Sequence, residues 1–452
     1  MGYIKNAEAL VSHGNAQMRS RMIEILDAGI ASADPYLKTK ELVSLEGDKL
    51  HVGKDLFDLN YYTRIYVLGA GKATYPIAKA LDDVLGDRIT DGVVICKYGQ
   101  EGSLEHMRLY HSSHPVPDEN GYSACRELMK IARQTVNTDI VFSISTGGST
   151  SLMPYPVEGV TIEDKRQTGF ALLRSGANMW EMNYVRTHLT QSKGGFLAKA
   201  IAPEAPILNI GVADGIGQGS DLCVEPTCPC SATFQDAQNV LTKYNLWDKV
   251  PKSVADYIRN GTPEQENPKD LSDRNIFNYL IVEVDKAVEG AYEKAKEMGY
   301  NTVILSTFVE GEAREIGAMM AFIAKEIASY DRPLKKPACF ITGGEATMNI
   351  RIPNPGEGGP SQQCALGAAV WMKDLDNVVI GCMDTDGTDG PTVYAGGIVD
   401  SSTIDCAEKN GIDIFKGMDE YSDSVVLKAL GDIVFTGGTG TNVNDLRVAI
   451  IE

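Results

Sequence analysis

Residues 383–392, MDTDGTDGPT, place three carboxylates in one short segment. Asp384, Asp386 and Asp389 alternate with glycine and threonine there, directly after the apolar run NVVIG at 377–381. A β-branched run of this kind is typical of a buried strand, so we expect the acids where a strand ends. Carboxylates this close repel one another unless a positive charge is shared between them. The segment therefore predicts a cation site.

A hard cation such as Mg²⁺ fits this composition, because it is held by one or two carboxylates and completed by phosphate oxygens. We predict that Asp386 and Asp389 hold Mg²⁺ carrying a nucleotide phosphate. An EF-hand is excluded because, counting from Asp384, positions five and twelve are Thr388 and Ala395. The alternative is a turn whose aspartates accept hydrogen bonds from neighbouring backbone amides.

Glycine-rich segments with hydroxyl, acidic or lysine residues follow apolar runs at five places. They are GAGKAT (69–74), STGGSTS (145–151), TGGEAT (342–347), DTDGTDGPT (384–392) and TGGTGTNVND (436–445). Ligands of open α/β sheets bind at the carboxyl ends of the strands, and glycine lets backbone N–H groups converge on an anion. Together the five segments predict a phosphate-handling site.

Lys72 lies in the first of these glycine-rich segments, GAGKAT. A Walker A loop is absent, because Tyr66 and Ala73 stand where glycine and a hydroxyl residue are needed, and Thr74 replaces the third glycine of a dinucleotide fingerprint. A cation at a helix start opposes the helix dipole, so we expect Lys72 to meet a phosphate or carboxylate. His114 in HSSHPVPDENG predicts a neutral structural histidine, with substrate contact as the alternative.

Composition narrows the class of protein. The chain has 452 residues, 43% of them hydrophobic, which predicts a globular protein of two or three domains. A formal charge of −19 argues against nucleic-acid binding, and no apolar stretch is long enough to span a membrane. Nine cysteines without a secreted-domain framework favour a reducing cytoplasm. The oligomeric state stays open, a homo-oligomer included.

Apolar runs and helical patterns alternate along most of the chain, which predicts an α/β fold with mostly parallel sheets. Residues 5–30 carry a helical pattern, and Thr161 with Asp164 in capping-box spacing predicts another helix start. The charged stretch 242–300 predicts a domain junction or an inserted helical segment. The expected strands are 64–71, 91–97, 139–146, 205–214, 301–308, the runs ACFITGGE and NVVIGC, and finally 432–435.

Several segments, in order, resemble the glycerate 2-kinase family, which is often labelled by its C-terminal MOFRL domain and sometimes called hydroxypyruvate reductase. The resemblance covers about residues 64–446. It rests on VLGAGKA, HPVPDE, STGGSTSLMPYPVEGVTIEDK, VRTHLTQSKGGFLA, EGEARE, TGGEAT, DGTDGPT and GTGTNVNDL.

The resemblance implies a Rossmann-like α/β domain over 1–240, a MOFRL-type α/β domain over 241–452 and an active site in the cleft between them. It also implies ATP and Mg²⁺, with the phosphoryl group placed on the 2-hydroxyl of D-glycerate. The catalytic residues would be Lys72, Lys193 and, as the candidate base, Asp214, with Asp386 and Asp389 on the metal. The substrate- and phosphate-binding residues would be Gly71, His114, Gly147, Gly148, Ser149, Gly344, Glu345, Gly438, Thr439 and Asn442.

Departures from the family pattern at Thr187, Pro360 and Gln363 remove charge that could hold an acid substrate or a triphosphate. Three alternatives therefore stay open: a kinase for another small sugar acid, a hydroxypyruvate reductase, and a non-catalytic metabolite-binding paralogue. Thr74 in place of a third glycine and the acid cluster weigh against the reductase.

Overall fold

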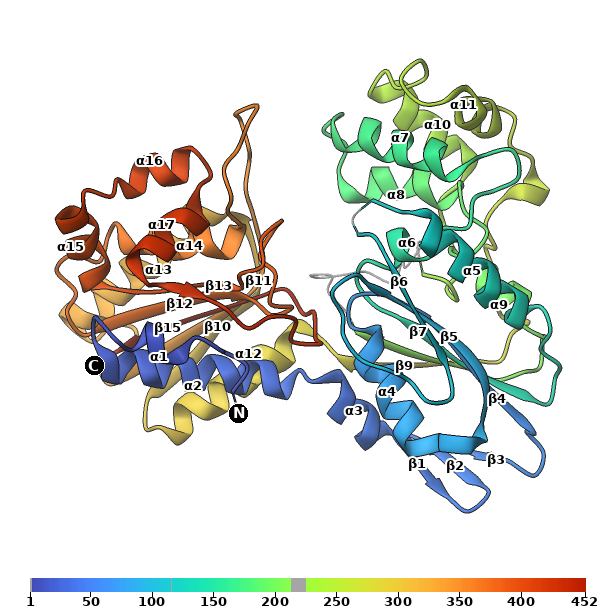
Figure 1. Cartoon of the computed structure of the whole chain (residues 1–452), viewed down its shortest axis with the longest axis horizontal. Helices are drawn as coiled ribbons and strands as arrows, with labels where there is room; N and C mark the ends of the chain where they lie inside the picture. The colour runs from blue at the N-terminus through green and yellow to red at the C-terminus, as the bar shows by residue number, and fades with distance from the viewer. Residues whose placement is uncertain (1, 115, 213–224) are drawn as a thin grey trace. The chain divides into compact units, whose positions relative to one another are not determined.

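The structure, a computed structural model, describes residues 2–114, 116–212 and 225–452. Among these residues the chain forms two compact units (Figure 1). Residues 35–212 and 225–281 form the central unit, and residues 2–34 and 282–452 form the terminal unit. These bounds differ from the expected division at 240. The break after residue 281 nevertheless lies inside the stretch 242–300 that was predicted to contain a junction.

The central unit contains a six-stranded sheet in the order β6-β5-β4-β7-β8-β9. The pairs β6–β5, β5–β4, β4–β7 and β7–β8 are parallel, so the predicted parallel sheet is confirmed in this unit. β4 and β7 are buried at nearly every position, as expected for parallel strands covered on both faces. The strands are β4 (Arg64–Ala70), β5 (Ile89–Lys97), β6 (Arg108–Ser112), β7 (Asp139–Ser145), β8 (Ile207–Val212) and β9 (Ile276–Val282).

A small antiparallel sheet and nine α-helices complete the described part of the central unit. The sheet is β1 (Val43–Glu46), β2 (Lys49–Val52) and β3 (Asp55–Asp58). The helices are α3 (Pro35–Leu42), α4 (Thr74–Leu85), α5 (Glu119–Ala132), α6 (Ser149–Leu152), α7 (Ile162–Leu173), α8 (Met179–Thr187), α9 (Phe196–Ala200), α10 (Phe234–Lys243) and α11 (Lys252–Arg259), with short 3₁₀ turns at Gly86–Arg88 and Pro263–Gln265. The predicted capping box of Thr161 and Asp164 is confirmed at the start of α7.

The terminal unit contains a second six-stranded sheet, in the order β10-β11-β15-β12-β13-β14. Only β10–β11 is parallel, so the expectation of a mostly parallel sheet is wrong here. β12 and β13 are joined by residues 385–395 without a helix, and such a connection permits only antiparallel pairing. The strands are β10 (Asn301–Glu312), β11 (Ala338–Thr347), β12 (Val378–Asp384), β13 (Gly396–Asp400), β14 (Ile433–Val434) and β15 (Asp445–Ile451).

Seven strands were missed from the sequence: β1, β2, β3, β6, β13, β15, and β9, which lies inside the stretch expected to be helical. Helices lie on both faces of the terminal sheet (Figure 1). They are α1 (Ala7–Leu10), α2 (Ala16–Ser32), α12 (Val284–Glu297), α13 (Ala313–Tyr330), α14 (Pro360–Ala369), α15 (Ser401–Asn410), α16 (Ile414–Asp419) and α17 (Asp423–Leu430).

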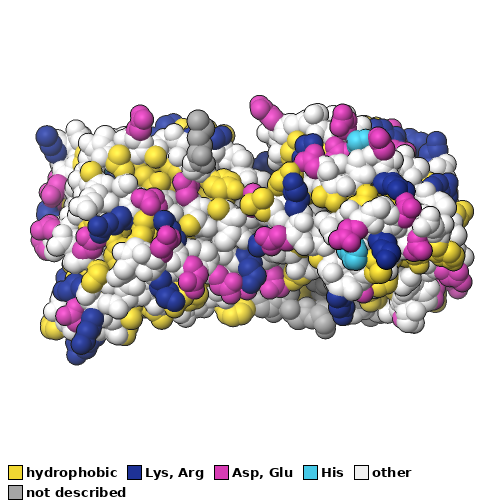
Figure 2. Space-filling model, turned by 90° about the horizontal axis from the view of Figure 1, so that it is seen from below, with side chains coloured by type: hydrophobic (Ala, Val, Ile, Leu, Met, Phe, Trp, Pro, Cys, Tyr) yellow, Lys and Arg dark blue, Asp and Glu magenta, His cyan; other side chains and the backbone are white. Residues whose placement is uncertain are grey.

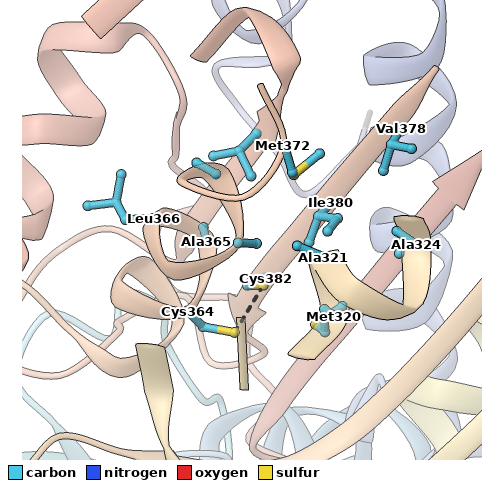
Figure 3. Close-up of a cluster of buried hydrophobic side chains, with 14 of the residues drawn as sticks. Met320, Ala321, Ala324, Cys364, Ala365, Leu366, Met372, Val378, Ile380 and Cys382 are labelled. Carbon is cyan, nitrogen blue, oxygen red and sulfur yellow. Dashed lines mark hydrogen bonds between the residues drawn. The ribbon is translucent and has the colours of Figure 1, made fainter. Parts of the chain in front are cut away.

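Alternating side chains of the terminal sheet fill two apolar cores. On one face α2 packs Met22 and Leu26 against residues such as Val379 of β12. On the other face α13 and α14 pack against Val378 and Ile380, as Figure 3 shows. The alternation of Val378, Val379 and Ile380 between the faces is the period of two that a pleated strand imposes. This packing explains why α2, near the start of the sequence, belongs to the terminal unit together with residues 282–452.

A buried ion pair network fixes α2 to the rest of the terminal unit. Arg19 is fully buried and donates from Nε to Asp400 Oδ2 at 2.6 Å and from Nη1 to Asp432 Oδ1 at 2.7 Å. Asp400 is also the N-cap of α15, and Asp432 directly precedes β14. Arg19 therefore joins three elements that are far apart in the sequence.

Charged side chains of both signs are interspersed over the face that Figure 2 displays. Among the described residues, none of the helices combines the length and the hydropathy that a membrane crossing requires.

Replacing Arg19 by methionine should destabilise the terminal unit by about 3–5 kcal/mol, because Asp400 and Asp432 would stay buried without their cation. Urea unfolding followed by tryptophan fluorescence measures the change. Arg21→Met is the matched control on the same helix. Arg21 is partly exposed and pairs with Glu452, and exposed pairs contribute at most about 1 kcal/mol. Equal stabilities for the two variants would contradict an anchoring role for Arg19.

Candidate functional site

The strand order of the central sheet places two glycine-rich segments side by side. β4 and β7 are parallel neighbours, with Ala70 of one opposite Ser145 of the other. From β4 the chain continues to β5 and β6 on one side, whereas from β7 it continues to β8 on the other. Ligands of open α/β sheets bind where the strand order reverses in this way. The segments after Ala70 and Ser145 therefore form the candidate site of this unit.

Backbone contacts interlock the segments after β4 and β7. Lys72 N donates to Gly147 O at 2.8 Å, and Ala73 N donates to Thr146 Oγ1 at 3.1 Å. Gly71 has a φ of +148°, and a Cβ on it would lie 2.0 Å from Thr146 Oγ1. Only glycine fits this approach. Thus Gly71 and Gly147 hold the two segments together.

Lys72, His114 and Gly148 lie next to one another. A Cβ on Gly148 would lie 2.9 Å from His114 Cδ2 and 3.3 Å from Lys72 Cγ, and the φ of Gly148 is +84°. His114 follows β6, so the carboxyl end of a third strand also contributes a residue to the candidate site. The structure thus brings together a lysine and a histidine that are 42 positions apart in the sequence.

Lys193 reaches the segment after β7 from the loop between α8 and α9. Its side chain is 2% exposed, and Nζ donates to Ser149 Oγ at 2.5 Å and to Thr150 Oγ1 at 3.1 Å. Ser192 Oγ fixes this loop by donating to Met153 O at 2.8 Å. The predicted residues Lys193 and Ser149 therefore do lie together.

In the terminal unit, the segments around 385 and 443 are joined by hydrogen bonds. Thr385 Oγ1 donates to Asn444 O at 2.7 Å and accepts from Val443 N at 2.9 Å. Thr439 Oγ1 donates to Thr385 O at 2.5 Å. β12 ends where its antiparallel neighbour β15 begins, which is why the two segments meet.

A glycine makes the closest approach between these segments. Gly387 has a φ of +87°, and a Cβ on it would lie 2.0 Å from Gly437 O. By contrast, a Cβ on Gly438 would meet no described atom within 4 Å. The backbone at Gly438 is thus open to a ligand, whereas Gly387 is needed for the packing of the two segments.

Asp386 faces the second of these segments. Its Oδ1 accepts from Thr388 N at 2.7 Å and from Thr388 Oγ1 at 2.5 Å, and its backbone oxygen accepts from Thr439 N at 3.3 Å. The side chain of Asn442, which lies three residues after Thr439 in the same glycine-rich segment, is buried. Asp386 therefore contacts two threonines, Thr388 through its carboxylate and Thr439 through its backbone oxygen.

The Asp389 carboxylate instead caps the N-terminus of helix α14. Its Oδ1 accepts from Ser361 N at 3.0 Å, and its Oδ2 accepts from Gln362 N at 2.8 Å and from Gln362 Nε2 at 2.9 Å. These are the first-turn amides that an N-cap side chain normally satisfies. Burial, reinforced by the nearby Asp445 carboxylate, raises the pKa of Asp389 to about 8. The geometry favours the turn and capping alternative for this aspartate.

Asp445 and Arg447 were missed from the sequence. Asp445 accepts from Ala346 N at 2.8 Å and from Ser361 Oγ at 3.0 Å, and it pairs with the fully buried Arg447. It therefore fixes the backbone beside Glu345, whose side chain is exposed. The segment GTGTNVNDL contained Asp445, but nothing local in the sequence indicates that it contacts residues 346 and 361.

The other predicted positions have mainly structural surroundings. Gly344 has a φ of +139°, and a Cβ on it would lie 2.2 Å from Val309 O of the neighbouring strand. Pro360 occupies the first turn of α14, where a missing N–H costs nothing. Gln363 and Thr187 are buried, and Gln363 donates to Met418 O at 3.2 Å. Asp214 lies outside the described residues.

The side chains present indicate whether a divalent cation could bind in the terminal unit. Among the described residues, no group of three or more acidic, histidine or cysteine side chains is arranged to hold a metal. Mg²⁺ needs no such cage, because it binds through one or two carboxylates and keeps waters and phosphate oxygens. Asp386 fits this donor set, whereas both oxygens of Asp389 already accept hydrogen bonds.

Comparison with known proteins identifies the class. Residues 21–259 match the family described as Domain of unknown function (DUF4147), and residues 338–445 match the MOFRL family. The chain is 36% identical to a glycerate 2-kinase of Pyrococcus horikoshii, over 95% of this chain and 96% of the relative. It is 40% identical to a D-glycerate 2-kinase of Thermotoga maritima, over 86% of this chain and 91% of the relative.

A solved structure is similar over the whole length. The crystal structure of a glycerate kinase from Thermotoga maritima matches with a TM-score of 0.81 at 37% identity, covering 96% of this chain and 100% of that chain. A relative in Agrobacterium vitis, 32% identical over 99% of this chain and 98% of its own length, is named putative hydroxypyruvate reductase. The chain is a kinase, a class that takes its phosphoryl group from ATP. It belongs to the glycerate 2-kinase family.

Replacing Gly387 by alanine should destabilise the terminal unit by at least about 1–2 kcal/mol, because the left-handed backbone alone costs that much for a residue with a Cβ. The contact with Gly437 O adds to this cost. Gly438→Ala, one residue beyond that contact, should leave the unfolding free energy nearly unchanged. Urea titrations of both variants measure the difference. A fully stable Gly387→Ala protein would show that the two segments do not depend on their close contact.

Proposed function

We propose that this chain transfers the γ-phosphoryl group of ATP to the 2-hydroxyl of D-glycerate. The observation that carries the proposal is the interlocked pair of segments after β4 and β7, which present Lys72 and the Lys193–Ser149 pair at the reversal of strand order. The relative named D-glycerate 2-kinase supports the substrate.

Phosphoryl transfer needs mainly positioning and neutralisation of charge rather than covalent chemistry. In the proposed mechanism, Lys72 offsets negative charge on the transferred group or on the substrate carboxylate. Lys193 orients Ser149, and the amides of 147–149 donate to substrate oxygens. In this mechanism His114, which lies next to Gly148, contacts the substrate. Water is kept from Lys193, since its side chain is almost fully buried.

In the terminal unit, Asp386 would hold Mg²⁺, with the open backbone around Gly438 and the hydroxyl of Thr439 beside it. The metal would neutralise phosphate charge. Gly344, Glu345 and Asn442 complete the polar surroundings in this proposal. Asp389 keeps α14 and the segment 384–392 in place. We retain Asp214 as the candidate base.

The proposed cytoplasmic location rests on the state of the cysteines. Eight cysteines of the described residues form no disulfide, which supports a reducing compartment such as the cytoplasm.

Release of ADP on mixing the protein with Mg²⁺-ATP and D-glycerate tests the function. L-glycerate and four-carbon aldonates, assayed in parallel, test for another acid as acceptor. Oxidation of NADH or NADPH with hydroxypyruvate, followed by absorbance, tests the reductase alternative. Reductase activity without ADP release would overturn the proposal. Ligand binding without either activity would favour a non-catalytic paralogue.

Replacing Lys72 by alanine should lower kcat/KM by about 100-fold or more, the scale found when one group that stabilises transition-state charge is removed. The melting temperature should change little, because the contacts that join the two segments run through the backbone. Lys54→Ala, at an exposed turn of the same unit, serves as the control and should leave activity unchanged. Near-normal turnover of Lys72→Ala would remove this lysine from the mechanism.

Replacing Asp386 by asparagine should raise the Mg²⁺ concentration needed for half-maximal activity by about tenfold, because a carboxylate ligand is lost. Asp389→Asn should leave this concentration unchanged and lower the unfolding free energy instead. Asp376→Asn, at an exposed position of the same unit, should change neither quantity. A shift in the Mg²⁺ requirement of Asp389→Asn alone would reverse the assignment of the two aspartates.

A further inference from the structure

The loop that carries Lys193 connects α8 with α9 and is buried along most of its length. His188, Thr190, Ser192 and Lys193 are each at most 4% exposed. Loops usually run over the surface, because a buried loop must find partners for its backbone and polar side chains. This loop therefore needs contacts from other parts of the chain to keep Lys193 in the interior.

The middle of the loop is held by the segment after α6. Gln191 N donates to Tyr155 O at 2.8 Å, and Ser192 Oγ donates to Met153 O at 2.8 Å. Both acceptors lie a few residues after β7, the strand whose following segment Lys193 contacts. These contacts fix the middle of the loop, whereas its two ends are held by a residue from elsewhere in the sequence.

The side chain of Asn267 contacts both ends of the loop. Its Nδ2 donates to Thr187 O at 3.5 Å and to Gly194 O at 3.4 Å, across 80 and 73 positions of sequence. Thr187 is the last residue of α8, and Gly194 directly follows Lys193. Asn267 is 1% exposed. One buried amide group therefore bridges the residues at which the loop begins and ends.

The surroundings of Asn267 explain why an amide is present at this position. Both hydrogen bonds are long, but a Cβ on Gly194 would lie only 2.5 Å from Nδ2, so the side chain packs directly against this glycine. The Oδ1 atom has no hydrogen-bond partner among the described residues. A buried oxygen without a partner is costly. The two contacts of Nδ2 are therefore the interactions that account for the amide.

The preceding residue, Glu266, fixes the segment from which Asn267 reaches the loop. Glu266 Oε2 hydrogen-bonds His188 Nε2 at 3.2 Å, and Oε1 accepts from Phe234 N at 2.8 Å in the first turn of α10. The other ring nitrogen, His188 Nδ1, hydrogen-bonds Tyr184 O of α8 at 2.7 Å. Glu266 thus ties this segment to α8 and to α10, so that Asn267 contacts the loop from a fixed position.

We propose that Asn267 is a positioning residue for phosphoryl transfer, which holds the ends of the loop so that Lys193 Nζ stays hydrogen-bonded to Ser149 and Thr150. The proposal rests on the kinase function proposed above, in which Lys193 orients Ser149. Reaction rates fall steeply when a participating group is displaced by as little as one ångström. Asn267 therefore acts through Lys193 and needs no contact with the substrate.

Two substitutions of Asn267 test this role by the rate of ADP release. Asn267→Leu keeps the branched shape but donates no hydrogen bond, and Asn267→Ala removes the side chain. Each should lower kcat/KM about tenfold, because Lys193 would lose its fixed position. Asn260→Ala, at an exposed position seven residues earlier, is the matched control and should leave kcat/KM unchanged. Normal turnover of both Asn267 variants would overturn the proposal.

A double variant shows whether Asn267 acts through Lys193, which a merely structural role would not require. Lys193→Met alone should lower kcat/KM by about 100-fold, the scale for removing one group that stabilises charge. Adding Asn267→Ala to Lys193→Met should lower kcat/KM further by at most about twofold, because residues that act as a unit are not additive. Losses that multiply in the double variant would show that Asn267 acts independently of Lys193.

Acetylation of lysines by acetic anhydride, quantified by mass spectrometry, follows the position of Lys193 without turnover. Lys193 is 2% exposed and should be protected in the wild type, with the exposed Lys54 as the internal reference. Its labelling should rise about tenfold in Asn267→Leu and Asn267→Ala, because a loosened loop opens more often. Asn260→Ala should keep the protection. Melting temperatures verify that each variant is folded.

The labelling separates a failure of this proposal from a failure of the proposed function. If Lys193 stays protected in both Asn267 variants, its positioning by Asn267 is wrong, even when the enzyme is an active kinase. If the wild type releases no ADP but the labelling of Lys193 rises in both variants, the positioning stands and the proposed function fails.

Discussion

The arrangement of the central unit depends on one constraint, namely that β4 and β7 are parallel neighbours. After β4 the chain continues toward one edge of the sheet, and after β7 it continues toward the other edge. Because the connections diverge, the segments that follow the two strands lie side by side at this edge of the sheet. Gly71 and Gly147 then allow the two backbones to touch. Lys72 and Ser149 owe their proximity to this topology, since 77 positions separate them in the sequence.

In the terminal unit, several buried carboxylates stabilise the fold. Asp389 caps a helix from another segment, Asp445 joins a strand to a buried arginine, and Asp400 with Asp432 surrounds Arg19. These four carboxylates are therefore structural, whereas Asp386 is the aspartate proposed above to hold Mg²⁺. An acid-rich segment does not by itself define a metal site, because buried amides and guanidinium groups compete for the same oxygens.

Local features of the structure could be predicted well from the sequence. The strands before Lys72 and Ser149 and the capping box of Thr161 depend on neighbouring residues, so they appear in the pattern itself. The resemblance to the glycerate 2-kinase family also agrees with the comparisons. Features that depend on residues far apart could not be predicted. The antiparallel pairing of β15 and the capping of α14 by Asp389 depend on which segments meet in space.

The place of β15 has a consequence for biosynthesis. This strand ends one residue before the end of the sequence and lies between β11 and β12, inside the sheet that α2 covers. While the ribosome is still making residues 445–451, α2 has no finished surface on which to pack. The central unit, whose sequence is complete by residue 281, can fold earlier. The apolar face of α2 therefore stays without its final partner until β15, made more than 400 residues later, has left the ribosome.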